Sequence, residues 1–150
     1  MAGILVGADG SDESFRALAW AMREAAQHDL PLTVMTVHPA PARPATHVYW
    51  NMPVLPEGGL SEEQTRAALQ QFVDLVAEEI GEKAPEVTLI VATGDPAAEL
   101  IRASQDADMV VLGRRGSGGF ATLLLGSVSG KVMHHAACPV MVVPAKRGQS

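Results

Sequence analysis

Short runs of apolar residues recur at five places along the chain, and each run is bounded by polar or turn-forming residues. Continuous apolar runs of about four to eight residues are typical of strands that are buried on both faces of a sheet. The second run is also rich in β-branched residues, which favour strands. The sequence therefore predicts strands at 3–8, 30–39, 86–94, 108–113 and 140–144.

The segments between these runs carry apolar residues at helical spacing and begin with residues that cap helices. Ser11 precedes two acidic residues, and the sequence "SEEQ" at 61–64 forms a capping box. Asp95 followed by Pro96 is another typical helix start. We therefore expect four helices, which run from Ser11 to about residue 29, from 61 to about 82, from 95 to about 105 and from 127 to about 136.

Strands that alternate with helices at this spacing predict one doubly wound α/β domain over residues 1–150, with a parallel sheet covered on both faces. In such sheets the ligand crevice lies at the carboxyl ends of the strands, where the strand order reverses. We expect Asp9, the end of the second strand near Val37, Gly94 and the glycine-rich segment after 108–113 to lie at this edge.

Residues 39–60 interrupt the alternation of strands and helices. This stretch holds five prolines and two glycines, which predicts an irregular loop. Long irregular loops inside compact domains are often binding loops or lids. Tyr49 and Trp50 lie in this loop, and they either pack it onto the domain or line a surface for a ligand or partner.

Residues 113–131, "GRRGSGGFATLLLGSVSGK", contain six glycines, three basic residues and no acid. Glycines lose much entropy on folding, so this density indicates a backbone requirement. The segment is not a Walker P-loop, because only three residues separate Gly126 from Gly130 and Val132 replaces the required Ser or Thr. It is not a dinucleotide fingerprint, because no acid follows Asp108 to bind a ribose. The spacing of Gly126 and Gly130 is also compatible with close helix packing.

The same segment fits a phosphate site made of two parts. Gly113 and Gly116 turn the chain out of the fourth strand, and Gly126 and Ser127 begin the last helix. The first N–H groups of a helix lack internal partners and lie at the positive end of its dipole, so anions bind there. Ser127 and Ser129 add hydroxyl donors. The pattern therefore predicts that a phosphate group approaches this backbone closely.

Charge is distributed unevenly along the chain. The net charge is −6, but all seventeen acidic residues lie at or before Asp108, and five basic residues follow it. An acidic protein with a basic end is not a general nucleic-acid binder, although it can hold one anion. No apolar stretch approaches the roughly 18–20 residues of a membrane helix, and the N-terminus lacks the features of a signal peptide. We expect no nucleic-acid or membrane partner.

Cysteine and histidine residues give no strong sign of a metal or catalytic site. The single Cys138 excludes an intramolecular disulfide framework, which suggests a reducing cytoplasm, and we expect it to be a small buried thiol. His134 and Cys138 are four residues apart, but two ligands do not make a metal site. Ser127 lacks the G-x-S-x-G surroundings of a hydrolase nucleophile. No metal ligand and no catalytic residue is predicted.

The spacing Gly113-x2-Gly116-x9-Gly126-Ser127 resembles the G-x2-G-x9-G-[ST] motif of the universal stress protein family, in its ATP-binding branch. "VGADGSDES" resembles the opening strand and turn of the family. "TGDPAAELIRASQDADMVVLGRRG" and "LLLGSVSGKVMHHAACPVMVV" resemble its C-terminal half. The resemblance covers nearly the whole chain and implies a Rossmann-like sheet of the adenine nucleotide alpha hydrolase type, with strand order 3-2-1-4-5.

The resemblance also implies roles for individual residues. Asp9 would lie beside the adenine and ribose, although the residues alone also fit an acid that closes a strand and caps a turn. The backbone at Val37 would bind the adenine edge. Arg114 and Arg115 replace smaller polar residues, and they either add charge to the phosphates or lie in solvent. The ribose and phosphates would be bound by Gly113, Arg114, Gly116, Gly126, Ser127, Val128 and Ser129.

The function implied by the resemblance is ATP binding by a regulatory or switch protein in stress adaptation. Mg²⁺ can accompany ATP, and ADP, AMP or a cyclic nucleotide are alternative ligands. The alternative function is a slow ATPase or a nucleotide-using transferase. Phosphoryl transfer needs a positioned base and usually a metal, and Asp9 is the only acid that the strand ends place near the pocket, so binding is favoured over catalysis. The complete glycine motif argues against a member that has lost its nucleotide.

The last strand predicts a homodimer. The four apolar residues Val140–Val143 form a strand that lies at a sheet edge in the order that the resemblance implies. An uncovered apolar edge pairs readily with another chain, and antiparallel pairing would give a closed two-fold interface. The alternative is a monomer in which the 39–60 loop covers this edge.

Overall fold

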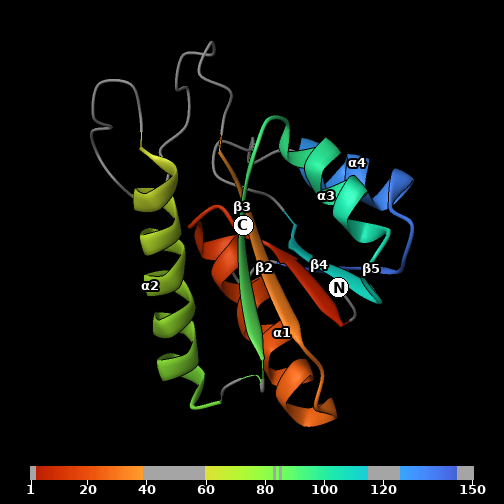
Figure 1. The fold of residues 1–150 in the computed structure, drawn as a ribbon. Coiled ribbons are helices and arrows are strands. Elements are labelled where there is room, and N and C mark those ends of the chain that lie inside the picture. Colours follow the sequence, from red (N-terminus) through yellow and green to blue (C-terminus); the bar gives the residue numbers. More distant parts are fainter. Residues whose placement is uncertain (1–2, 39–59, 83, 85, 115–125, 145–150) are drawn as a thin grey trace.

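A five-stranded, wholly parallel sheet lies between two layers of helices (Figure 1). The structure, a computed structural model, describes residues 3–38, 60–82, 84, 86–114 and 126–144. The strands are β1 (Ile4–Gly7), β2 (Leu32–His38), β3 (Val87–Thr93), β4 (Met109–Gly113) and β5 (Val140–Val143). The helices are α1 (Asp12–His28), α2 (Glu62–Ile80), α3 (Pro96–Ser104) and α4 (Ser127–His135). The order β3-β2-β1-β4-β5 confirms the predicted doubly wound fold and strand order.

The helices start at the predicted capping residues. The side chains of Ser11, Ser61 and Asp95 each accept a hydrogen bond from an N–H group in the first turn of their helix, where N–H groups have no partner inside the helix. Helix α2 ends at Ile80, slightly earlier than predicted, because Gly81 adopts a left-handed φ of 71°. No helix in the described ranges has both the length and the apolar character needed to cross a membrane.

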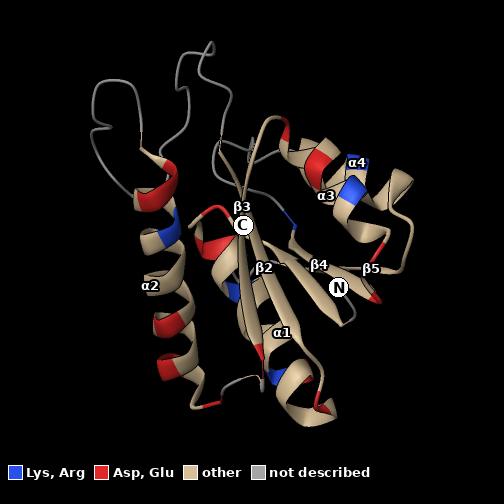
Figure 2. Cartoon of the chain, viewed as in Figure 1, with Lys and Arg blue, Asp and Glu red and all other residues tan. Residues whose placement is uncertain are grey.

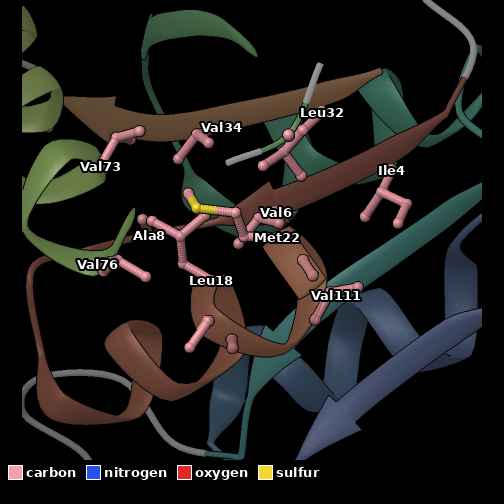
Figure 3. Packing of buried hydrophobic residues seen from close by; sticks show 14 of the residues in the cluster. Ile4, Val6, Ala8, Leu18, Met22, Leu32, Val34, Val73, Val76 and Val111 are labelled. Carbon is pink, nitrogen blue, oxygen red and sulfur yellow. The ribbon is translucent and has the colours of Figure 1, made fainter. Parts of the chain in front are cut away.

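Apolar side chains form a separate cluster on each face of the sheet. Successive strand residues point to opposite faces, so β1 contributes Ile4 and Val6 to one cluster and Leu5 to the other. Figure 3 shows the first cluster, in which Val6 lies close to Met22 of α1. Helices α1 and α2 cover this cluster, whereas α3 and α4 cover the second. Each fully buried aliphatic side chain stabilises the fold by roughly 1.5–3 kcal/mol.

The neighbouring strands β1 and β4 lie at the point where the sheet order reverses. The chain leaves β1 into α1 on one face, and α4, which follows β4 in the chain, covers the opposite face (Figure 1). The register pairs Val6 with Val111, so the residues that follow β1 lie beside the last residues of β4. At the other end of these two strands, where they begin, Asp108 Oδ2 accepts a hydrogen bond from the N–H of Gly3 at 2.8 Å. The carboxyl ends of β1 and β4 therefore lie where a ligand crevice is expected in a sheet of this type.

Candidate functional site

Two hydrogen bonds join the start of α4 to the end of β4. Ser129 donates its hydroxyl hydrogen to the carbonyl of Gly113 at 2.7 Å, and Gly126 donates its N–H to the carbonyl of Arg114 at 2.8 Å. Arg114 in turn donates its N–H to the carbonyl of Val143 at 3.1 Å. The structure therefore places Gly113 beside the start of α4, as the predicted two-part phosphate site requires of the described residues.

The first turn of α4 has no side-chain cap. Its N-cap is Gly126, whose backbone is extended (φ −71°, ψ 162°) and which has no side chain to accept a hydrogen bond from the helix. The turn contains no acidic residue, and Ser127 is exposed. N–H groups at such a helix start carry the positive end of the dipole. This turn is therefore able to bind an anion.

Ser129 has a different part in this site from the one suggested by the sequence. Ser129 as a whole residue is only 4% exposed, and its hydroxyl hydrogen is donated to the carbonyl of Gly113. A hydroxyl group has a single hydrogen to donate, so Ser129 positions α4 rather than donating to a ligand. The exposed hydroxyl of Ser127 is free of this constraint and remains a candidate donor to a phosphate.

Gly113 permits a close approach between α1 and β4. A Cβ atom at this position would lie 2.8 Å from the main-chain carbon and oxygen of Glu13 and 2.9 Å from its Cβ, all shorter than van der Waals contact. The sequence suggests that this glycine makes room for a phosphate, whereas the structure shows that it makes room for a helix. At Gly130, by contrast, a Cβ would meet no described atom within 4 Å, so the described residues show no close helix packing at Gly130.

Asp9 closes the turn between β1 and α1. Its Oδ1 accepts a hydrogen bond from the N–H of Ser11 at 3.0 Å, and Gly10 between them has a φ of 81°, which favours glycine. This is the turn-capping role that the residues alone suggest. The partly buried Asp9 lies two residues after the end of β1, beside the end of β4, where the resemblance places the adenosine.

Val37 lies near the carboxyl end of β2, the strand on the other side of β1. The next residue, His38, accepts a hydrogen bond at its carbonyl from the N–H of Gly94 at 2.9 Å. Val37, Asp9 and the end of β4 therefore lie along one edge of the sheet, as predicted. Of the other residues singled out in the sequence, Gly116, Arg115, Tyr49 and Trp50 lie outside the described residues.

Glu13 lies beside Gly113 at the end of β4, and the sequence analysis does not single it out. It lies in the first turn of α1 against Gly113, in the acidic first turn that Figure 2 shows at the carboxyl edge of the sheet. Its Oε2 atom is enclosed and has no hydrogen-bond partner among the described residues. Glu13 comes from a helix start, so it adds a second acid to Asp9, the acid that the strand ends predict at this edge of the sheet. The strand order could have revealed this contact, because it places the helix that follows β1 beside the end of β4.

Cys138 lies just before β5 and is partly rather than fully buried. Burial raises the pKa of its thiol, the charge of Asp108 raises it further, and a backbone hydrogen bond with Val110 lowers it. The thiol therefore stays protonated to a higher pH than an ordinary cysteine, which lowers its reactivity. Within the described ranges, no three His, Cys, Asp or Glu side chains are grouped so that they could hold a metal ion.

Sequence comparison relates the chain to one family over almost its whole length. The model of the universal stress protein family matches residues 2–144. The chain is 42% identical over 142 residues to a universal stress protein of Mycolicibacterium smegmatis, and this match covers 94% of the chain and 47% of the relative. The chain thus spans about half the length of the curated relatives it matches.

Solved structures show the same relationship. The fold is similar to that of the universal stress protein UspA from Lactobacillus plantarum, with a TM-score of 0.73, 26% identity and coverage of 95% of this chain and 97% of that one. It is also similar to a universal stress protein solved in complex with cAMP, with a TM-score of 0.67, 25% identity and coverage of 95% of each chain. Together with the match over residues 2–144, these similarities show that the chain belongs to the universal stress protein family.

Proposed function

We propose that the chain binds an adenine nucleotide, with the phosphates at the first turn of α4 and the adenosine near the carboxyl ends of β1 and β2. The observation that carries this proposal is the uncapped start of α4, which Ser129 and Gly126 tie to the end of β4. A helix start held in this way suits a phosphate, because its N–H groups and its dipole both favour negative charge. The relative in complex with cAMP supports an adenine nucleotide as the ligand.

ATP is the nucleotide that we favour, because the glycine spacing resembles that of the ATP-binding branch. Arg114 adds a positive charge at the end of β4, beside the start of α4, and a triphosphate gains more from this charge than a monophosphate. ADP, AMP and a cyclic nucleotide are the alternatives, since each can place a phosphate at the same turn. We propose a regulatory or switch role in stress adaptation, in which occupancy by the nucleotide changes the behaviour of the protein.

A substitution at Gly126 tests this function. Its φ of −71° is accessible to any residue, so Gly126→Val places a branched side chain at the helix start without requiring a left-handed backbone. Calorimetric titration should show that ATP affinity falls by about tenfold or more, which is a loss of roughly 1.4 kcal/mol in binding free energy. Gly130→Ala is the matched control, because its added methyl group meets open space, and it should bind ATP as the unaltered protein does. Equal affinity in a folded Gly126→Val variant would overturn the proposed site.

The identity of the ligand has a separate test. The protein is purified without added nucleotide and denatured, and the released small molecules are identified by mass spectrometry. An adenine nucleotide in the released fraction supports the proposal and shows which nucleotide the protein retains. If no nucleotide is released, and titration with ATP, ADP, AMP and cAMP shows no binding, the proposed function is wrong.

We propose that catalysis at this site is absent or slow. The glycine-rich segment lacks the Lys–Ser/Thr pair of a P-loop. Glu13 lies against Gly113 at the end of β4, but its Oε2 is enclosed, whereas a general base must contact the attacking water. A fixed phosphate site without a positioned base favours retention of the nucleotide over its turnover.

We also propose that two copies associate through β5. In the described residues β5 pairs only with β4, so its other edge offers free main-chain groups. At the other edge strand, β3, a main-chain group already has a partner, because the Arg66 side chain of α2 donates a hydrogen bond to the carbonyl of Leu89 at 3.0 Å. Met141 is 37% exposed on β5, and Met133 is 46% exposed on α4. A second copy paired along β5 would satisfy the edge and form a two-fold interface.

A further inference from the structure

Helix α4 differs from the other three helices in the charges near its start. Helices α1, α2 and α3 each carry at least one acidic residue in the first turn, where the helix dipole favours negative charge. The first turn of α4 carries none, and the first charged residue of this helix is Lys131. Lys131 is exposed and forms no ion pair with any residue that the structure describes. It is therefore a cation near the positive end of a helix dipole, where positive charge is unfavourable unless an anion is present.

Lys131 lies on the same side of α4 as Ser127. Residues four positions apart share one face of a helix, and the bond from Cα to Cβ tilts toward the amino end of the helix. The rise between the two residues is about 6 Å, which the flexible four-carbon stem of a lysine can span. Because both residues are exposed, the ammonium group of Lys131 can reach back along an open surface to the start of α4.

This surface is also the open side of the proposed phosphate site. The next two residues of the first turn face inward, since Val128 packs against the second apolar cluster and Ser129 is buried against the carbonyl of Gly113. Ser127 is the exposed residue of this turn. A phosphate bound at the start of α4 can carry further phosphate groups on the side of Ser127, and these groups would then come within reach of Lys131.

We propose that Lys131 binds the terminal phosphates of the nucleotide, so that the site prefers di- and triphosphates to a monophosphate. This inference rests on the proposed nucleotide site and specifies the class of nucleotide that the site selects. Lysine binds phosphate as a point charge with three N–H donors, and its attraction grows with the charge of the phosphate chain. AMP and a cyclic nucleotide place their single phosphate at the helix start, so they gain little from Lys131.

Lys131→Met tests the proposal, because methionine keeps an unbranched side chain and a high helix propensity but removes the charge. Calorimetric titration should show that this variant binds ATP about tenfold more weakly than the unaltered protein, whereas its affinity for AMP should change by less than about twofold. Lys131→Arg, which keeps the charge, should retain most of the preference for ATP. Lys131 is exposed, so both substitutions should leave the free energy of unfolding nearly unchanged. Lys131→Gln is a second uncharged variant, for use if Lys131→Met does not fold.

Arg23→Gln is the matched control for the loss of charge. It removes one positive charge from an exposed helical position, but this position lies in the second half of α1, which runs away from the carboxyl ends of the strands. The variant should bind ATP and AMP as the unaltered protein does. A fall in ATP affinity equal to that of Lys131→Met would show that net charge, rather than contact with Lys131, sets the preference, and would overturn the proposal.

Phosphorus NMR of bound ATP gives a readout that is independent of affinity. At saturation and in EDTA, the γ-phosphate signal of ATP on the unaltered protein should differ from its position in free ATP. This difference should become smaller in Lys131→Met, while the α-phosphate signal should be the same in both proteins. An identical γ-phosphate signal in the two proteins would show that Lys131 does not contact the terminal phosphate.

The outcomes separate this inference from the function on which it rests. If the unaltered protein binds neither ATP nor AMP, the nucleotide site itself is wrong. If it binds AMP as tightly as ATP, the nucleotide site stands and the preference for polyphosphates is wrong. If Lys131→Met binds ATP as the unaltered protein does, Lys131 is not a phosphate ligand. Equal losses of ATP and AMP affinity in that variant would show that Lys131 acts on the shape of the site, and would also overturn the proposal.

Discussion

The hydroxyl group of Ser129 donates a hydrogen bond to the carbonyl of Gly113 at 2.7 Å, and this bond fixes the start of α4 at the end of β4. The two residues are sixteen positions apart in the chain, and the bond is shielded because Ser129 is buried. The geometry of the proposed phosphate site depends on it, because the first turn of α4 supplies the N–H groups. A buried side chain thus determines where an exposed helix start is presented.

Replacing Ser129 with alanine should lower both stability and nucleotide affinity. The substitution leaves the Gly113 carbonyl without its partner, and such a loss typically costs about 1–3 kcal/mol. Urea unfolding measures this cost, and titration with ATP measures the change in affinity. Ser127→Ala is the control, because Ser127 is exposed, and its unfolding free energy should change by less than about 0.5 kcal/mol. Equal stability of the two variants would contradict the role given to Ser129.

Two glycine-to-alanine substitutions should have opposite effects on stability. At Gly113 the new methyl group meets the main chain of Glu13 at 2.8 Å, so the variant should lose about 1–3 kcal/mol. At Gly130, inside α4, the methyl group meets no atom within 4 Å, so the variant should gain up to about 1 kcal/mol from higher helix propensity. Thermal unfolding of both variants checks the pair. Similar destabilisation at both positions would show that the contact with Glu13 is not decisive.

Replacing Val142 with proline should convert a dimer into a folded monomer. The carbonyls of Pro139 and Val143 accept hydrogen bonds from the N–H groups of Val110 and Arg114. In a parallel sheet, every second residue of a strand bonds to the same neighbouring strand. The N–H of Val142 therefore points away from β4, to the free edge. Proline removes that N–H without breaking the ladder to β4. Light scattering at micromolar concentration should show a dimer for the unaltered protein and a monomer for the variant. A dimer that persists in the folded variant would exclude β5 as the interface.

ATP turnover should be absent or far below the roughly 1–10³ per second of typical enzymes. The physical reason is that the glycine-rich segment lacks the Lys–Ser/Thr pair of a P-loop, and that the Oε2 atom of Glu13, which lies against the end of β4, is enclosed. Phosphate release is measured on protein purified in parallel with the Gly126→Val variant, which controls for contaminating ATPases. Turnover of tens per second in the unaltered protein, abolished by Ser127→Ala, would support the enzyme alternative.

The strands and helix starts are predictable because local signals determine them. A run such as Ile4–Gly7 is apolar on both faces, and capping residues such as Ser61 mark helix starts whatever the tertiary structure. The strand order is not local, because periodicity does not say which strands are neighbours. That order came from the resemblance, which carries information about the whole fold.

The parts of the site that sequence analysis misses all depend on contacts between distant segments. Glu13 lies against Gly113 only because β1 and β4 are neighbours. Ser129 looks like a ligand donor in the sequence, but burial against Gly113 gives its hydroxyl an internal partner. Glycine spacing alone does not distinguish room for a ligand from room for a helix. The same residues therefore point to the correct edge of the sheet while leaving their individual roles open.

Chemical-shift mapping of ATP binding tests the central claim most directly. The backbone N–H signals of the isotope-labelled protein are followed by NMR during titration with ATP in Mg²⁺. The proposed site predicts that the signals of Arg114, Ser127 and Val128 shift most, because phosphates would bind the start of α4 at the end of β4. Unchanged signals at these residues, or shifts confined to the amino ends of the strands near Gly3 and Asp108, would contradict the proposed site.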